Sequence, residues 1–538
     1  MPTSPAASAA TAASLALWLA AVAMSGCAER PATAAADPPR VNVLFAISDD
    51  QSYPHAGAYG AEWVRTPAFD RVAREGLLFE RAYTPNAKCA PSRACILTGR
   101  NSWELGAAAN HSPYFPPRFR SVIEALGQAG YRTGCTGKGW APGVAEAADG
   151  SPRELTGPGY RQRRSPGPTP AISTIDYAAN FDDFLAARER DDPDAPFFFW
   201  YGGNEPHRPY AFGSALEQSA RTPSDAPPVP GMWPADDTVR TDLLDYAYEI
   251  EHFDRHLAAM LDALEERGEL DRTLVVVTAD NGMPFPRIKG QAYERSNHLP
   301  LAVRWPGGIA DPGRRVPDYV SFVDFAPTFL ALAGLTAESA GMAAITGRSL
   351  LPLLDGTATS PHREHVLIGK ERHDVGRPRD AGYPIRGIVR EDYLYLENRE
   401  PSRWPLGNPE TGYLNADGSP TKTLLLERRR EGRDTAGLWA VNFGRRPPVE
   451  LYDLDADPDC LVNLSADPAH RERQRAMRET LARELRAQED PRALGRGDTF
   501  DAFPYAGEWA NFYERYAAGE EVTAPWVEEG DAEPAPLE

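Results

Sequence analysis

Two apolar runs that each end in acidic side chains constrain the fold of this chain more than any other feature. They cover residues 41–47 (VNVLFAI) and 274–279 (LVVVTA). Continuous apolar runs of this length are typical of strands buried on both faces of a parallel sheet. Ligands of such sheets bind beyond the carboxyl ends of the strands, so we expect the side chains that follow the two runs to meet at one site. These side chains are Asp49, Asp50, Asp280 and Asn281.

Helices are predicted between the strands. Residues 242–267 place apolar side chains at helical spacing and stop at Gly268, and residues 197–201 (FFFWY) form a third strand candidate. Strands that alternate with helices predict an α/β domain, in which helices cover both faces of a mostly parallel sheet. We place this domain at residues 41–354.

The pattern changes beyond residue 354. Residues 386–390 and 393–396 have the spacing of a hairpin, and residues 471–488 have that of one polar-faced helix. These elements predict a smaller α+β domain over residues 355–516. The last residues, 517–538, are acidic and contain proline, which predicts a loosely ordered tail.

Composition limits the classes of partner. The chain has 538 residues, which is enough for two domains. Its 77 acidic and 57 basic side chains give a net charge of −20, which argues against nucleic acid and anionic membrane as general partners. An anionic substrate would therefore need a local basic pocket. Five cysteines without a CxxC pair allow at most one disulfide and indicate no zinc site.

The N-terminus predicts export. An apolar run at residues 12–24 is too short for a membrane span, and the small residues between it and Cys27 are typical of a bacterial lipoprotein signal. In that case Cys27 is lipidated, and cleavage removes the segment before it. An ordinary secretory signal is the alternative. We assign residues 1–27 to the signal and residues 28–40, rich in Ala and Pro, to a linker. The protein is then periplasmic or at the cell surface, with membrane contact only through a lipid on Cys27.

The most specific string in the sequence covers residues 89–100 (CAPSRACILTGR). It matches C-x-P-S-R-x-x-x-L-T-G-R at every fixed position, and through this motif the chain resembles the type I sulfatases over about residues 41–467. The resemblance implies an alkaline-phosphatase-like fold with a large mixed, mostly parallel sheet. It also implies that a formylglycine-generating enzyme oxidises Cys89 to Cα-formylglycine, whose hydrated aldehyde attacks sulfur. A buried structural thiol is the alternative, but it leaves the Pro-Ser-Arg that follows unexplained.

The resemblance places a metal ion on the two acidic clusters. Carboxylate and amide oxygens without His or Cys favour calcium, with magnesium as the weaker option. A divalent ion polarises a sulfate oxygen and lowers the pKa of the attacking diol. Paired acids at a strand end can also simply cap a loop, but the second cluster argues against that. The metal ligands are Asp49, Asp50, Asp280 and Asn281.

Sulfuryl transfer needs fixed positive charge around the sulfate oxygens. By resemblance, Lys138, His207 and Lys289 occupy the cationic positions of the family, and Arg93 contacts the metal ligands and the diol. His207 would protonate the departing oxygen or nitrogen, because an alkoxide or amide anion leaves poorly at neutral pH.

One position departs from the family pattern. Family members commonly have Gly-Lys-x-His after the cysteine motif, and that histidine acts as the base when the sulfated intermediate collapses. This chain has Trp140 instead. Either another histidine, such as His55 or His111, supplies the base, or the collapse step is arranged differently.

Residues 280–286 (DNGMPFP) resemble the heparan N-sulfatase (sulfamidase) branch of the family. The expected substrate is therefore N-sulfoglucosamine at the non-reducing end of heparin-like saccharides. Segments 369–374 and 383–386 are also similar to proteins of that branch, and their basic side chains would contact neighbouring anionic sugar groups; ordinary surface charge is the alternative. These side chains are Arg372, His373 and Arg386.

Other functions share part of this pattern. An O-sulfatase acting on another polysaccharide would use the same core chemistry. A phosphatase of the alkaline phosphatase superfamily would place Ser or Thr where Cys89 stands and would add His ligands for zinc. A noncatalytic glycan-binding lipoprotein would lack the joint set of Lys138, His207 and Lys289.

Overall fold

The structure is a computed structural model that describes residues 41–537. The predicted signal, the linker and Cys27 lie outside the described residues. Within residues 41–537, none of the helices combines the length and the apolar character needed to cross a membrane. The four cysteines of this range, Cys89, Cys95, Cys135 and Cys460, are buried free thiols.

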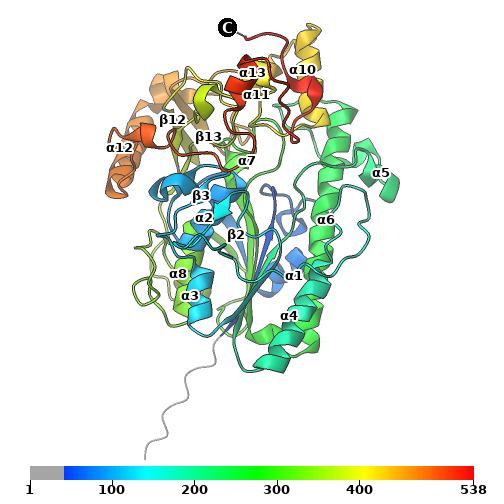
Figure 1. Ribbon diagram of the computed structural model, residues 1–538, viewed down its shortest axis with the longest axis vertical. Helices are drawn as coiled ribbons and strands as arrows, with labels where there is room; N and C mark the ends of the chain where they lie inside the picture. Colours follow the sequence, from blue (N-terminus) through cyan, green and yellow to red (C-terminus); the bar gives the residue numbers. More distant parts are fainter. Residues whose placement is uncertain (1–40, 538) are drawn as a thin grey trace, which may run out of the picture. The chain divides into compact units, whose positions relative to one another are not determined.

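A seven-stranded sheet lies at the centre of the fold, in the order β4-β6-β1-β7-β8-β2-β9 (Figure 1). The predicted runs form its middle: β1 (Asn42–Ser48) pairs in parallel with β7 (Thr273–Ala279) on one side and with β6 (Phe197–Gly202) on the other. Only the pairings of β8 are antiparallel, so the sheet is mixed and mostly parallel, as expected. The other strands are β2 (Leu77–Tyr83), β4 (Arg132–Gly137), β8 (His298–Arg304) and β9 (Arg315–Ser321).

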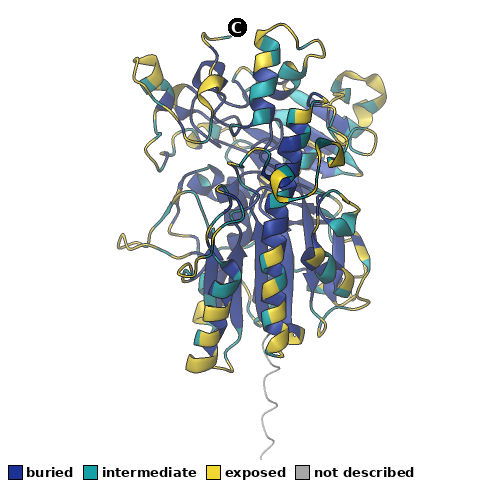
Figure 2. Ribbon diagram, turned by 90° about the vertical axis from the view of Figure 1, so that its right-hand side faces the viewer, coloured by how far each residue is buried: buried dark blue, intermediate teal, exposed yellow. Residues whose placement is uncertain are grey.

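Helices cover both faces of this sheet, because alternate residues of β1 point to opposite sides. Val43, Phe45 and Ile47 pack in a core with one set of helices, and Leu44 and Ala46 pack in a core with the other. The first set is α2 (Cys89–Thr98), α3 (Val122–Gln128) and α8 (Phe325–Leu332), and the second is α1 (Pro67–Glu75), α4 (Tyr177–Asp191) and α6 (Asp237–Glu266). Figure 2 shows the strands buried between helices whose outer faces are exposed.

The predicted long helix is α6, which begins earlier than the apolar pattern indicates. Its first residues follow Asp236, whose side chain accepts a hydrogen bond from the Thr238 backbone and so caps the helix. The remaining short helices and strands lie in the region of the central sheet and in the C-terminal part. They are α5 (Ser214–Gln218), α7 (Glu294–Asn297), α9 (Leu351–Leu354), α10 (Pro420–Arg430), α11 (Leu438–Phe443), α13 (Phe512–Ala517), β3 (Tyr114–Phe115) and β5 (Val144–Ala145).

A second, antiparallel sheet follows in the C-terminal part, in the order β10-β11-β12-β13. The predicted hairpin is β11 and β12, and the predicted helix is α12 (Arg471–Ala487), which packs on both strands. Both sheets belong to one compact unit, Arg40–Glu538, and a domain division near residue 354 stays a prediction. The strands are β10 (Val366–Lys370), β11 (Ile385–Arg390), β12 (Tyr393–Asn398) and β13 (Val449–Asp453).

The C-terminal tail corrects an expectation. Residues 517–538 were predicted to be loosely ordered, yet Asp531 and Lys422 form an ion pair at 2.9 Å with both side chains fully buried. Trp526 Nε1 also donates to the Leu414 carbonyl at 2.8 Å. The acidic composition of the tail predicts disorder, but Asp531 has a specific buried cation as its partner.

Candidate active site

Cys89 is the first residue of α2, at the carboxyl edge of the central sheet. Every residue of this helix is buried, and Gly99 ends it in the left-handed conformation at φ 68°, which favours glycine. The Cys89 Sγ lies 3.5 Å from Asp49 Oδ1, the carboxylate that follows β1. Burial, and then Asp49, raise the pKa of the Cys89 thiol well above its ordinary value. An unmodified thiol here is therefore neutral and a poor nucleophile.

The acidic clusters of β1 and β7 meet, as the sequence predicts. Because Ser48 pairs with Ala279, the residues that follow them emerge side by side. The Asp50 N–H donates to Asp280 Oδ1 at 3.0 Å, and the Asn281 amide donates to Asp50 Oδ1 at 2.6 Å.

Three carboxylates share a small volume at this edge. Ligand atoms of Asp49, Asp50 and Asp280 all lie within 4.8 Å of one another. Burial, and then the charge of Asp49, raise the pKa of Asp280, as expected for neighbouring like charges. The Asn281 Oδ1 is buried and has no hydrogen-bond partner. Three carboxylates and an orphaned amide oxygen are the donor set of a hard divalent cation.

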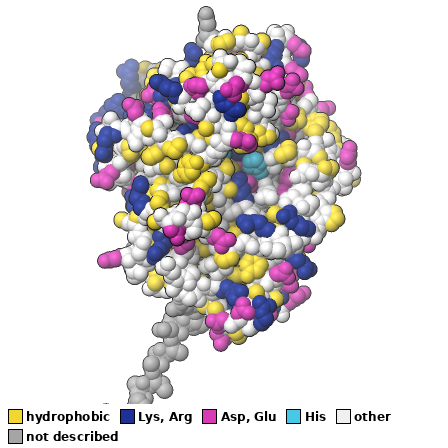
Figure 3. All heavy atoms as spheres, in the orientation of Figure 1, with side chains coloured by type: hydrophobic (Ala, Val, Ile, Leu, Met, Phe, Trp, Pro, Cys, Tyr) yellow, Lys and Arg dark blue, Asp and Glu magenta, His cyan; other side chains and the backbone are white. Residues whose placement is uncertain are grey.

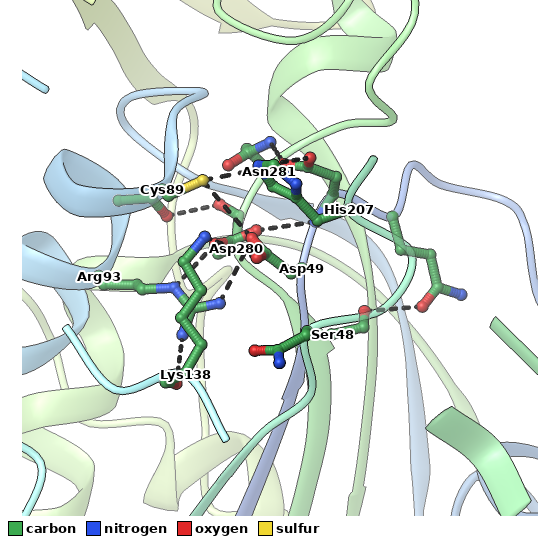
Figure 4. Close-up of polar contacts among 12 residues, drawn as sticks. Ser48, Asp49, Cys89, Arg93, Lys138, His207, Asp280 and Asn281 are labelled. Atoms are coloured by element: carbon green, nitrogen blue, oxygen red, sulfur yellow. Dashed lines mark hydrogen bonds and ion pairs between the residues drawn. The ribbon is translucent and has the colours of Figure 1, made fainter. Parts of the chain in front are cut away.

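Arg93 joins the two clusters from within α2. Its Nε donates to Asp280 Oδ2 at 2.8 Å, and its Nη1 donates to the carbonyls of Lys138 and Gly139. The Nη2 lies 3.6 Å from Asp49 and is buried without a hydrogen-bond partner. Figure 4 shows Cys89, Arg93 and Lys138 directed toward the Asp49 and Asp280 carboxylates. One donor of Arg93 is therefore free for an anion at the site.

Two lysines approach the carboxylates from different segments. Lys138 Nζ lies 2.6 Å from Asp49 Oδ2, and Lys289 Nζ lies 2.6 Å from Asp50 Oδ2. Burial would raise the pKa of Asp49, but the charges of Lys138, His207 and Arg93 together lower that pKa to about 2. Both predicted cations are thus next to the carboxylates that are the candidate metal ligands.

His207 completes the predicted set. Its Nδ1 lies 2.6 Å from the Arg208 carbonyl, which can only accept, so Nδ1 carries a proton. The other nitrogen, Nε2, lies 3.9 Å from Asp50 Oδ2 and faces the site. The His207 side chain is 33% exposed. On the face shown in Figure 3, histidine side-chain atoms lie in a recess of the surface.

Trp140 fills the position where the family commonly has histidine. Its indole nitrogen donates to the Ala90 carbonyl at 3.0 Å, and its ring packs edge-on against Phe115. Of the two candidate replacements, His55 bonds to the Tyr246 hydroxyl at 3.0 Å, and burial lowers its pKa to about 3. His111 pairs instead with an acid, Asp374, at 2.9 Å.

The three predicted substrate contacts are held by interactions inside the protein. Arg386 is fully buried and bonds to Glu371 at 2.7 Å and to Asp490 at 2.9 Å. This corrects both interpretations of Arg386, as a sugar contact and as a surface charge, because its charge is matched by two interior carboxylates. Arg372 donates to the carbonyls of Phe503 and Pro504, at 2.7 and 3.0 Å.

His373 is likewise internal. Its Nδ1 lies 3.0 Å from the Gly290 carbonyl and its Nε2 lies 2.6 Å from Asn86 Oδ1. Its ring is fully buried, so both nitrogens are used inside the protein. His373 and Arg372 precede Asp374 in the chain and fix the backbone there.

Sequence reasoning missed Asp417. Its Oδ2 lies 2.7 Å from Lys289 Nζ, and it shares with Asp50 and His207 a cluster of ligand atoms within 4.8 Å of one another. Burial would raise the pKa of Asp417, but Lys289, and then Lys88, lower it well below its ordinary value. The local string Asn-Ala-Asp-Gly-Ser has only the signature of a turn, so the sequence carries no signal for this residue.

Comparison with known proteins agrees with this geometry. The family model "Sulfatase" matches residues 41–335. Human N-sulphoglucosamine sulphohydrolase is 29% identical over 472 residues, covering 82% of this chain and 89% of that protein. An ulvan-active sulfatase of Formosa agariphila is 24% identical, covering 84% of this chain and 75% of that protein.

Solved structures share the fold. The structure of BT4656 in complex with its substrate D-glucosamine-2-N,6-O-disulfate superposes with a TM-score of 0.56 at 20% identity, covering 84% of this chain and 98% of that one. The family model spans more than half of the 538 residues. This chain is therefore a member of the sulfatase family, whose enzymes hydrolyse sulfuric esters.

Proposed function

We propose that this sulfatase releases sulfate from saccharides, with formylglycine at residue 89 as its nucleophile and one bound calcium ion. The observation that carries the proposal is the position of Cys89. Its side chain enters the carboxylate cluster, 3.5 Å from Asp49, where a thiol is held neutral. A hydrated aldehyde at the same position supplies a hydroxyl nucleophile instead.

The residues around Cys89 fit a divalent cation. Asp49, Asp50, Asp280 and Asn281 would hold it, and the buried, unpartnered Asn281 Oδ1 is the ligand atom that the protein alone leaves unused. When bound, calcium polarises a sulfate oxygen and lowers the pKa of the nucleophilic hydroxyl.

The cationic side chains have separate roles in this proposal. Lys138, Lys289 and the free Nη2 of Arg93 surround the position of the sulfate oxygens, where negative charge develops. They need no rearrangement, because each is already held by a carboxylate of the site.

His207 is the proton donor to the leaving group. Its Nδ1 proton is occupied by the Arg208 carbonyl, so Nε2 is the nitrogen that transfers a proton. A sulfamate nitrogen must be protonated before it departs, and an ester oxygen benefits from the same proton.

N-sulfoglucosamine at the non-reducing end of heparin-like saccharides is the substrate we favour. Support comes from residues 280–286 and from the similarity to human N-sulphoglucosamine sulphohydrolase over 89% of its length. The similarity to an ulvan-active sulfatase supports a second candidate, an O-sulfatase on another sulfated polysaccharide. The proposal includes maturation by a formylglycine-generating enzyme and export, with a lipid anchor on Cys27.

Two measurements on the active enzyme test the proposal. Peptide mass spectrometry should find an aldehyde in place of the thiol at residue 89, and Cys89→Ala should abolish turnover without changing the fold. A fully active preparation that holds only unmodified cysteine would contradict the nucleophile. Sulfate release is then compared between N-sulfoglucosamine and its 6-O- and 2-O-sulfated counterparts; release from the O-sulfated sugars alone replaces the sulfamidase assignment by the O-sulfatase.

A further inference from the structure

A second polar cluster lies next to the reaction centre, built around Asp374. Lys88 Nζ lies 2.8 Å from Asp374 Oδ2, and His111 Nδ1 lies 2.9 Å from Asp374 Oδ1. The Asp374 N–H donates to Asn415 Oδ1 at 2.5 Å. One carboxyl residue thus organises three polar side chains from three distant segments.

This cluster adjoins the catalytic residues. Lys88 directly precedes Cys89 in the chain, and its charge acts on Asp417, the carboxylate that holds Lys289. Asn415 precedes Asp417 by two residues. The cluster therefore lies beside Lys289, one of the residues that surround the sulfate position in the proposed function.

Besides Asp374 Oδ2, which forms the ion pair with Lys88, two polar atoms of the cluster are buried and have no hydrogen-bond partner. They are His111 Nε2 and Asn415 Nδ2. Buried polar atoms are nearly always hydrogen-bonded, so each such exception needs an explanation. Arg93 Nη2 and Asn281 Oδ1, at the proposed sulfate and cation positions, share this property.

The hydrogen-bonding role of each atom follows from its neighbour. Asn415 Oδ1 accepts from a backbone N–H, so the free atom is the amide nitrogen, a donor. His111 Nδ1 faces a carboxylate and carries the proton, and burial lowers the pKa of His111 to about 4. The free Nε2 is then an acceptor at neutral pH.

A donor and an acceptor placed about one carboxylate match a hydroxyl-bearing ring, since each hydroxyl both donates and accepts. We infer that His111 and Asn415, held by Asp374 and Lys88, bind hydroxyl groups of the substrate's sugar ring and select saccharides over other sulfate esters. This inference rests on the proposed saccharide function. It replaces Arg372 and His373 as the residues that contact the sugar, because Arg372 Nη1 and Nη2 and both ring nitrogens of His373 bond to oxygens inside the protein.

The test compares two substrates on the mature enzyme: the sulfated monosaccharide that it cleaves best and 4-nitrophenyl sulfate, which has no sugar hydroxyls. The quantity measured is the ratio of kcat/KM for the saccharide to kcat/KM for the aryl sulfate. His111→Ala and Asn415→Ala should each lower this ratio about tenfold, mainly through KM, which is the loss expected for one hydrogen bond to the substrate. His470→Ala, a histidine of the C-terminal part, is the matched control and should keep the ratio.

The ratios measured for the two variants decide whether the cluster binds the sugar. If both variants keep the wild-type ratio, or lose activity equally on the two substrates, the cluster does not read the sugar and the inference is overturned. Thermal melting identifies a variant that does not fold, and the other variant then decides. Wild-type enzyme that cleaves the aryl sulfate and no saccharide overturns the proposed function first, and the inference with it.

Discussion

Lys289 holds Asp417 in the reaction centre, with Nζ and Oδ2 2.7 Å apart. The same Nζ lies 2.6 Å from Asp50 Oδ2. Lys289 therefore joins the Asp50 carboxylate, which follows β1, to the Asp417 carboxylate of the C-terminal part. The side chains of all three residues are at most 5% exposed, so solvent screens these charges little. The position of the Lys289 charge therefore depends on both acids.

Asp417→Asn should lower kcat/KM about tenfold to hundredfold, because a charge-assisted hydrogen bond that positions Lys289 is weakened. Steady-state kinetics on the preferred substrate measures the loss. The exposed Asp355→Asn is the matched control. In a double-mutant cycle with Lys289→Met, the two losses should be non-additive; additive losses would show that Asp417 acts independently of Lys289.

Calcium should stabilise the protein as well as activate it. Binding to the native state alone adds about 2.7 kcal/mol at a free concentration of 100 times Kd. We expect Tm to rise when calcium replaces chelator, by more than it rises with magnesium. Asp280→Ala should remove this rise, and Asp355→Ala should keep it. Calorimetry in the two conditions checks the result, and a Tm that responds to zinc but not to calcium would reject the assigned ion.

Asp254 should give a measurable pH dependence of stability. Its carboxylate accepts the N–H groups of Ala68 and Phe69 at the start of α1, and burial raises its pKa from 3.8 to about 7. Since the folded-state pKa is the higher one, this contribution to stability is fully present below pH 3.8 and is lost as the pH rises through 7.

Asp254→Asn removes the titrating group and keeps one acceptor. Relative to this variant, the free energy of unfolding of the wild type should fall by up to about 1.4 kcal/mol per pH unit between about pH 4 and pH 7. Urea unfolding at a series of pH values measures both proteins. Parallel pH profiles would mean that Asp254 ionises equally in the folded and unfolded states.

The tail should contribute both to stability and to activity. Asp531→Ala leaves Lys422 buried without its anion, a change that costs about 3–5 kcal/mol in comparable pairs. Lys422 also donates to the Ala416 carbonyl at 2.8 Å, next to Asp417, so kcat/KM should fall as well. Urea unfolding and kinetics are compared with Glu529→Gln, an exposed acid of the same segment. Equal unfolding midpoints for the two variants would show that the tail is dispensable.

The reaction centre was predictable as far as it depends on local sequence. An apolar run buried on both faces has a recognisable composition, and parallel strands present their carboxyl ends at one edge. Asp49 and Asp280 therefore meet as expected, and the cysteine motif, a contiguous string, identifies Cys89 and Arg93. The spacing of the hairpin and of α12 is equally local.

Asp417, Asp374 and the buried tail depended on the tertiary structure. An aspartate in a turn string has the same local signature whether it lies in solvent or pairs with a lysine 128 residues away, as Asp417 does with Lys289. Arg386 shows the converse, since its basic character indicated a surface or a ligand contact and two interior carboxylates neutralise it. Neighbouring residues determine strand burial and the cysteine motif, whereas packing between distant segments determines the partner of a buried charge.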